Sequence, residues 1–320
     1  MAKGVLAKYK DYLPLTDDTP IFSLGEGDTP LVKSRHIVDL VGCEELYFKL
    51  EGCNPTGSFK DRGMVVAVAK ALEAGGNSLA CASTGNTSAS AAAYGAYCGI
   101  PTTVIVPKGN VARGKLAQAV AYGARIMLIQ GSFDHAMQLV RDLTERHPIV
   151  LVNSINPHRL QGQKTAAFEV VEELGTAPDY VFIPVGNAGN ITAYWMGFQE
   201  AYHNEWTSIR PRMMGFQAAG AAPIVRGDVV TEPETIATAI RVGNPASWDK
   251  ALTARDESGG TIDMVTDDNI MEAYKMLASK EGVFCDPASA ASLAGLIKHA
   301  KAGLNLEGQK VVCIIPGHGL

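Results

Sequence analysis

Short apolar runs alternate with longer segments of helical periodicity along most of this chain. The first thirty residues are rich in turn-forming residues. After them, β-prone runs are predicted at residues 46–50, 79–83, 102–106, 125–129 and 149–152. Helical segments are predicted between these runs, at residues 64–72, 87–98, 112–122 and 133–147. Because strands that alternate with helices favour parallel pairing, this half predicts a mostly parallel sheet covered by helices on both faces.

The second half repeats the pattern after a polar, Pro-containing crossover at residues 153–158. Buried strands are predicted at residues 180–185 and 310–315, and helices at residues 191–205, 267–280 and 287–302. The predicted fold class is therefore α/β, with two open, mostly parallel sheets covered by helices. Residues 50–152 are expected to form a smaller domain, and residues 1–49 with 153–320 a larger one. Ligands of such sheets bind at the carboxyl ends of the strands, so the site is expected in the cleft between the two domains.

The composition of the 320 residues is that of an ordinary globular protein, with 47% hydrophobic and 19% charged residues. The formal net charge is −5, which argues against nucleic acid as the main partner because phosphate backbones require a basic surface. Local basic groups could still bind a small anion.

The six cysteines lie singly, without a C-x-x-C pair or a His-rich spacing. This pattern favours buried free thiols in a reducing cytoplasm over disulfides or a metal site. The N-terminus has no apolar signal core, and no run approaches about 18 apolar residues. A cytoplasmic protein without metal or membrane contact is expected.

Residues 54–63, with the sequence NPTGSFKDRG, indicate the first chemical site. Two turn-formers precede Ser58, a good N-cap, and a helical run follows. Lys60 would then lie in the first turn of a helix, where the macrodipole disfavours a positive charge and lowers the pKa of the amine. A neutral amine is what an imine-forming lysine needs. The alternative is a solvated lysine followed by a surface pair, Asp61 and Arg62.

Residues 83–90, STGNTSAS, lie between a predicted strand and a helix that opens on small residues. Hydroxyl groups and free backbone N–H groups at a helix start form an anion pocket of the size of a carboxylate. Asn86 can present an amide to a ring oxygen. The alternative is a simple capping turn, although four hydroxyls and an Asn in six positions exceed what capping requires.

Residues 186–190, GNAGN, follow a strand and open another helix. Glycines allow close approach of the backbone, and successive N–H groups can bind a phosphate. A lone G-x-x-G is a weak signal, and the G-x-G-x-x-G pattern of dinucleotide sites is absent. The loop therefore favours a single phosphate over a pyrophosphate.

Together these features suit pyridoxal 5'-phosphate, which has an aldehyde, a ring hydroxyl and one phosphate, with an amino-acid substrate supplying the carboxylate. The sequence resembles the fold-type-II pyridoxal-phosphate enzymes, whose fold is like that of the tryptophan synthase β chain, and within them the threonine synthase family. The resemblance extends over nearly the whole chain, at residues 25–31, 54–63, 83–90, 153–159, 186–192, 240–248 and 281–291. The last three segments distinguish the chain from the dehydratases better than the lysine motif, which the wider group shares.

The resemblance implies cofactor contacts. Lys60 would bind the cofactor aldehyde as an imine, with Phe59 near the ring and Asn86 at the ring hydroxyl. The cofactor phosphate would be bound by the loop Gly186, Asn187, Ala188, Gly189 and Asn190. Pro316 stands where the family usually places a hydroxyl residue against the pyridine nitrogen, and its side chain has no donor.

The resemblance also implies a substrate site. Residues Ser83, Thr84 and Thr87 would bind the carboxylate. The phosphate of O-phosphohomoserine would be bound by Asn153, Ser154, Arg159 and Asn187. Arg159 carries most of this interpretation, because a guanidinium recognises phosphate bidentately and a dehydratase acting on serine or threonine has none to bind. The alternative for Arg159 is a surface charge at the start of a helix over residues 159–174.

The implied reaction is a β,γ-replacement, in which O-phosphohomoserine and water give threonine and phosphate, with Lys60 taking the α-proton. Two alternatives remain open at this point: a threonine or serine dehydratase, and a catalytically silent cofactor-binding protein of the same fold. The resemblance further implies a homodimer.

Overall fold

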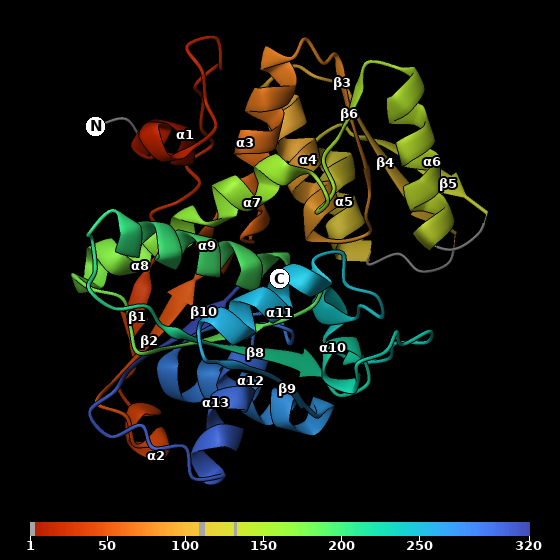
Figure 1. The fold of residues 1–320 in the computed structure, drawn as a ribbon. Helices are drawn as coiled ribbons and strands as arrows, with labels where there is room; N and C mark the ends of the chain where they lie inside the picture. Colours follow the sequence, from red (N-terminus) through yellow and green to blue (C-terminus); the bar gives the residue numbers. More distant parts are fainter. Residues whose placement is uncertain (1–3, 109–112, 131–132) are drawn as a thin grey trace. The chain divides into compact units, whose positions relative to one another are not determined.

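The structure is a computed structural model that describes residues 4–108, 113–130 and 133–320. The chain divides into two compact units. The smaller unit comprises residues 1–27 and 54–163, and the larger unit residues 28–53 and 164–320. The predicted fold class is confirmed, since each unit contains a mostly parallel sheet with helices (Figure 1).

The sheet of the smaller unit has four parallel strands in the order β5-β4-β3-β6. These strands are β3 (Ser78–Ala82), β4 (Thr102–Pro107), β5 (Arg125–Ile129) and β6 (Ile149–Leu151). The helices of this unit are α1 (Val5–Lys8), α3 (Lys60–Glu73), α4 (Asn86–Tyr97), α5 (Arg113–Ala121), α6 (Phe133–Arg146) and α7 (Pro157–Gln163). One face of the sheet packs on α6, where Ala80, Ala82 and Ile105 contact Ala136 and Val140. The predicted helix at residues 112–122 begins at a residue outside the described part.

The sheet of the larger unit has six strands in the order β1-β2-β10-β7-β8-β9, of which only β1 is antiparallel to its neighbour among the described strands. The strands are β1 (Leu31–Lys33), β2 (Glu45–Leu50), β7 (Tyr180–Pro184), β8 (Arg212–Ala218), β9 (Thr261–Val265) and β10 (Lys310–Ile315). The helices are α2 (Val38–Val41), α8 (Thr165–Leu174), α9 (Gly189–His203), α10 (Pro223–Arg226), α11 (Trp248–Glu257), α12 (Asp267–Glu281) and α13 (Ala291–Lys301). In the core, the rings of Phe182 and Phe216 stack with centroids 5.7 Å apart. Gly295 of α13 lies against Phe216, where a Cβ would come within 2.4 Å of the ring, so the helix packs closely on the sheet.

Two predicted helices differ from the observed ones. The segment predicted as one helix over residues 159–174 is two helices, α7 and α8, with Lys164 between them. The predicted helix at residues 287–302 begins only at Ala291, because residues 286–290 form successive turns stabilised by the Asp286 carboxylate. The strands β1, β8 and β9 were not among the predicted elements.

The observed unit boundaries also differ from those predicted, since residues 1–27 and 153–163 belong to the smaller unit and residues 50–53 to the larger one. For residues 153–163 the reason lies in the packing of α7 on α3. A Cβ at Gly162 would lie 1.9 Å from the carbonyl oxygen of Arg62, and a Cβ at Gly63 would lie 2.6 Å from the carbonyl oxygen of Arg159. The two glycines let the helix backbones approach closely, and this attaches α7 to the smaller unit.

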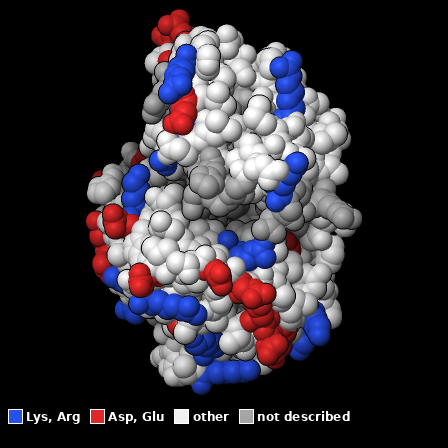
Figure 2. Space-filling model, turned by 90° about the vertical axis from the view of Figure 1, so that its right-hand side faces the viewer, with Lys and Arg blue, Asp and Glu red and all other residues white. Residues whose placement is uncertain are grey.

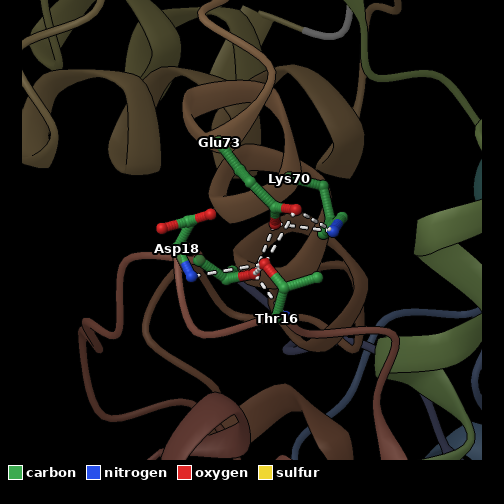
Figure 3. A network of polar contacts seen from close by, with 5 residues as sticks. Thr16, Asp18, Lys70 and Glu73 are labelled. Carbon is green, nitrogen blue, oxygen red and sulfur yellow. Dashed lines mark hydrogen bonds and ion pairs between the residues drawn. The ribbon is translucent and has the colours of Figure 1, made fainter.

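A polar network at the end of α3 connects the N-terminal residues to the smaller unit (Figure 3). The hydroxyl groups of Thr16 and Thr19 both donate to the Glu73 carboxylate, which also pairs with Lys70 at 2.6 Å. The network therefore orders a turn-rich segment that has little secondary structure of its own.

Acidic and basic side chains are interspersed in small groups on the face drawn in Figure 2. Among the described residues, no helix combines the length and apolar character needed to cross a membrane. Within the same ranges, no group of three or more His, Cys, Asp or Glu side chains is arranged to hold a metal ion.

Candidate active site

Helix α3 begins at Lys60, as the sequence predicts for the lysine in a first turn, but its N-cap residue is Phe59 and no side chain caps it, so the prediction of Ser58 as N-cap is wrong. The turn before it is fixed by the carboxylate of Asp61. This carboxylate accepts from the N–H and hydroxyl groups of Thr56, both at 2.7 Å, and from the hydroxyl of Ser90 at 2.6 Å. Asp61 and Arg62 are fully buried, so their interpretation as a solvated surface pair is wrong. Sequence reasoning missed the anchoring role of Asp61, because one of its donors, Ser90, lies on another helix.

The Lys60 amine lies 3.9 Å from the centre of the Phe59 ring. Burial, and secondarily the positive charge of Arg159, lower the pKa of the Lys60 amine to about 7 from its ordinary value of 10.5. The direction agrees with the prediction from the sequence. The main physical cause is desolvation, whereas the sequence argument invoked the helix dipole. An amine with this pKa is substantially uncharged at neutral pH and can act as a nucleophile or a base.

Arg159 lies on α7 and is 1% exposed, so the alternative of a surface charge is wrong. Its Nη1 donates to the carbonyl of Val152 at 2.7 Å, and its Nη2 donates to the carbonyl of Lys60 at 3.4 Å. Burial lowers the pKa of the guanidinium to about 10. The structure thus brings Arg159 and Lys60 together within one unit.

Asn153 is also buried, and both ends of its amide are hydrogen-bonded to one backbone residue. Its Oδ1 accepts from the Ala82 N–H at 2.9 Å, and its Nδ2 donates to the Ala82 carbonyl at 2.8 Å. Asn153 therefore continues the β6 ladder beside β3 and fixes the backbone that leads into Ser83. Ser154, the next residue, is partly exposed.

The hydroxyl-rich run forms the start of α4, which begins at Asn86. Its N-cap residue is Gly85, and no side chain caps the helix. The hydroxyl of Ser83 accepts from the Gly85 N–H at 3.2 Å, and that of Ser88 donates to the Gly85 carbonyl at 2.6 Å. The run is therefore not the simple capping turn considered above, and the first N–H groups of α4 are left for an anion.

Ser83, Thr84 and Thr87 are partly exposed around this helix start. The Oδ1 atom of Asn86 is buried and has no hydrogen-bond partner within the described ranges. A buried polar atom without a partner is costly, so this carbonyl oxygen is suited to a ligand donor such as a ring hydroxyl.

In the larger unit, residues 185–188 join β7 to α9, and Gly189 and Asn190 are the first residues of that helix. Ala188 has the left-handed conformation, with φ 63°, and a Cβ at Gly186 would lie 3.0 Å from the Cα of Ile240. The side-chain oxygen of Asn187 accepts from the Ala246 N–H at 3.3 Å, and its carbonyl accepts from the Ser247 N–H at 3.1 Å. The segment 240–248 therefore packs against the loop and is hydrogen-bonded to it at Asn187. Both segments are among those that carry the family resemblance.

Helix α9 begins at Gly189 without a side-chain cap, so its first N–H groups are available to an anion. Asn190 is buried, and neither Oδ1 nor Nδ2 has a hydrogen-bond partner in the part of the chain that the structure describes. A helix N-terminus beside an unsatisfied buried amide fits a single phosphate group.

Pro316 follows β10 directly, at the carboxyl end of that strand. The turn after it is rigid: the Gly317 N–H donates to the hydroxyl of Ser289 at 2.9 Å, and a Cβ at Gly52 would lie 2.7 Å from the backbone nitrogen of His318. Sequence reasoning did not identify Ser289 as the anchor of this turn. Its only sequence signal is its place in the segment 281–291.

The chain is similar to known proteins over nearly its whole length. A family model described as pyridoxal-phosphate dependent enzyme matches residues 22–317. The chain is 57% identical over 318 residues to the threonine synthase of Halalkalibacterium halodurans, covering 99% of this chain and 89% of that protein. It is 51% identical over 322 residues to the threonine synthase of Methanocaldococcus jannaschii, covering 98% and 80% of the two chains.

The fold is also similar to solved structures of lower identity. Maize serine racemase matches with a TM-score of 0.80 and 23% identity, over 99% of this chain and 92% of that one. The processed form of threonine deaminase isoform 2 from Solanum lycopersicum matches with a TM-score of 0.78 and 21% identity, over 100% and 86%. At this identity the likeness concerns the fold alone.

Proposed function

This chain belongs to the pyridoxal-phosphate-dependent enzyme family, and we propose that it acts as a threonine synthase, converting O-phosphohomoserine and water into threonine and phosphate. The observation that carries the proposal is the near full-length identity of 51–57% to proteins of that name from distant organisms. The lowered pKa of Lys60 and the two uncapped helix starts supply the chemistry that such an enzyme needs.

The described residues fit pyridoxal 5'-phosphate. Lys60 would hold the cofactor covalently, with Phe59 at the ring and Asn86 at the ring hydroxyl. The loop 186–190 would bind the phosphate through backbone N–H groups, and the unsatisfied Asn190 amide supports this assignment. Pro316 would face the pyridine nitrogen without offering it a donor. When bound, the cofactor supplies an electron sink for the negative charge that develops at the α-carbon of the substrate.

The amine of Lys60 is the proposed acid and base. Its pKa of about 7 lets it take the α-proton in the neutral form and return a proton in the charged form. The balanced reaction removes a proton from Cβ, releases phosphate from Cγ, adds a proton at Cγ and adds water at Cβ, and then returns the proton to the α-carbon. The substrate gains one water and loses one phosphate, with no change in oxidation state overall.

The substrate would be oriented at both of its charged ends. The carboxylate would be bound at the start of α4 by Ser83, Thr84 and Thr87. Its phosphate would be bound by Ser154, Arg159 and Asn187, and Asn153 would position the neighbouring backbone. Holding both ends fixes the reacting carbons near the Lys60 amine, which lowers the entropic cost of reaction. The Nε atom of Arg159 is buried without a hydrogen-bond partner in the described part of the chain, which supports a phosphorylated substrate over serine or threonine.

The purified chain, loaded with cofactor, tests the proposal directly. Incubation with O-phosphohomoserine should release threonine and inorganic phosphate in equal amounts. Formation of an oxo acid from threonine or serine, without threonine from O-phosphohomoserine, would instead identify a dehydratase. A visible absorption change on substrate addition without any product would identify a silent cofactor-binding protein.

A homodimer is proposed on the family resemblance, and light scattering should give a mass of twice 33.9 kDa. A cytoplasmic location is proposed because all six cysteines are unpaired, which suits a reducing compartment. Fractionation of the native cells would test the location.

A further inference from the structure

We propose that Arg159 is a positioning residue for Lys60, which clamps the first turn of α3 against the end of β6 and places a positive charge at the backbone of the lysine. This role is separate from binding a substrate phosphate, since it operates in the chain without any ligand. Its consequence for catalysis rests on the function proposed above.

The clamp is built from backbone acceptors. Through its two terminal nitrogens the guanidinium joins the carbonyl of Val152, just after β6, to the carbonyl of Lys60, at the first position of α3. These acceptors are neutral, and no carboxylate lies within ion-pair distance of Arg159 among the described residues. The positive charge is therefore not neutralised by a salt bridge. Because Arg159 is buried, its charge is weakly screened and disfavours other positive charges nearby.

The glycines of α3 and α7 make this geometry possible. Gly63 leaves room for Arg159, because a Cβ there would lie 2.8 Å from the Nε atom. On α7, Gly162 has no Cβ atom, which would otherwise clash with the carbonyl oxygen of Arg62. The side chain is thus held from both helices, and its long stem has little freedom to move away from Lys60.

The electrostatic consequence is that the ammonium form of Lys60 is disfavoured. Arg159 is the charged group that, together with burial, lowers the pKa of Lys60 in the described structure. The other ionisable groups on α3 are Asp61, Arg62, Lys70 and Glu73. Those on segments packed around it include Glu26, Cys81, Tyr94 and His158. The Asp61 carboxylate accepts hydrogen bonds from Thr56 and Ser90, and burial raises its pKa. Glu26 accepts from the Tyr94 hydroxyl at 2.8 Å.

The test measures the protonation of Lys60 in the full-length chain after removal of the cofactor. A brief pulse of an amine-reactive reagent is applied across a pH series, and the labelled fraction of the Lys60 peptide is read by mass spectrometry. In the wild-type chain, half-maximal reactivity is expected at a pH of about 7. In Arg159→Gln, which keeps an amide donor but loses the charge, the midpoint should rise by about one unit.

Lys70→Gln is the matched control, because it removes a positive charge from the same helix that is already paired with Glu73. Its Lys60 profile should match the wild type. If Arg159→Gln does not fold by circular dichroism, Arg159→Met is measured instead, with the same expected shift. A folded variant with an unchanged Lys60 profile would overturn the inference, even if the enzyme makes threonine. Conversely, a wild type that makes no threonine but shows the Arg159-dependent shift would overturn the proposed function alone.

Discussion

The amide of Asn153 takes the place of a strand residue beside Ala82, accepting from its N–H at 2.9 Å and donating to its carbonyl at 2.8 Å. The β6 strand ends at Leu151, so a side chain continues the backbone pairing after the main chain has turned away. This arrangement positions the carboxyl end of β3, after which the segment beginning at Ser83, the proposed carboxylate site, starts.

Asn153→Ala should lower the free energy of unfolding by about 2–4 kcal/mol, because the buried N–H and carbonyl of Ala82 both lose their partner. Urea unfolding followed by circular dichroism measures this change. Ser154→Ala is the control, and it should stay within about 0.5 kcal/mol of the wild type. Equal effects of the two substitutions would refute the role given to Asn153.

Lys60→Met should stabilise the cofactor-free chain, and more so at low pH. The folded pKa of Lys60, about 7, lies below the ordinary value of 10.5, so between these values the unfolded chain binds the extra proton. The free energy of unfolding of the wild type therefore rises with pH between about 7 and 10.5. Below pH 7 the folded chain bears the full free-energy cost of burying the protonated amine. That cost is up to about 5 kcal/mol at 1.36 kcal/mol per pKa unit.

Unfolding curves of the wild type and Lys60→Met at pH 6 and pH 9 test this prediction. The gain in stability from the substitution should be larger at pH 6 than at pH 9. A gain that is independent of pH would mean that Lys60 titrates normally in the folded chain.

Gly186→Ala should weaken cofactor binding by about tenfold, since the new Cβ must displace the Ile240 backbone 3.0 Å away and so distort the phosphate loop. Ala188→Gly is a matched control in the same loop. Because Ala188 is left-handed, glycine relieves strain of about 1 kcal/mol and should leave affinity nearly unchanged. Titration of the cofactor followed by its absorption gives both affinities. If Gly186→Ala binds as tightly as Ala188→Gly, the loop does not hold the phosphate.

Gly162→Ala should destabilise the smaller unit by about 3 kcal/mol or more, because its Cβ would lie 1.9 Å from the carbonyl oxygen of Arg62 and force α7 away from α3. Thermal unfolding measures the loss. The same displacement moves Arg159 from Lys60, so the Lys60 labelling midpoint should also rise in any folded fraction. A variant as stable as the wild type would show that the two helices are not in close contact.

Several features follow from local sequence alone, because they depend on residues that are neighbours along the chain. The alternation of apolar runs predicts most of the strands, although the short strand β9 and the Gly- and Gln-containing strand β8 lack a clear period. The turn residues 54–57 predict a helix start near Lys60, and the structure places it there. The loop at 186–190 is likewise predicted as a strand-to-helix turn.

Other features depend on residues about one hundred positions apart, and no local pattern encodes them. The sequence suggested that the helix dipole lowers the pKa of Lys60, whereas burial and Arg159 are its causes in the folded chain. Arg159 was considered either a phosphate ligand or a surface charge. Its burial excludes the surface charge, and its hydrogen bonds to two backbone carbonyls could not be predicted from the sequence.

The sequence by itself thus determined the α/β class, the position of Lys60 at a helix start and the two turns that open α4 and α9, since period and turn chemistry are local properties. Only the tertiary structure decided where the units divide, which side chains are dehydrated and which carbonyls Arg159 joins. Burial and charge proximity arise from packing between distant segments, and they set the protonation of Lys60.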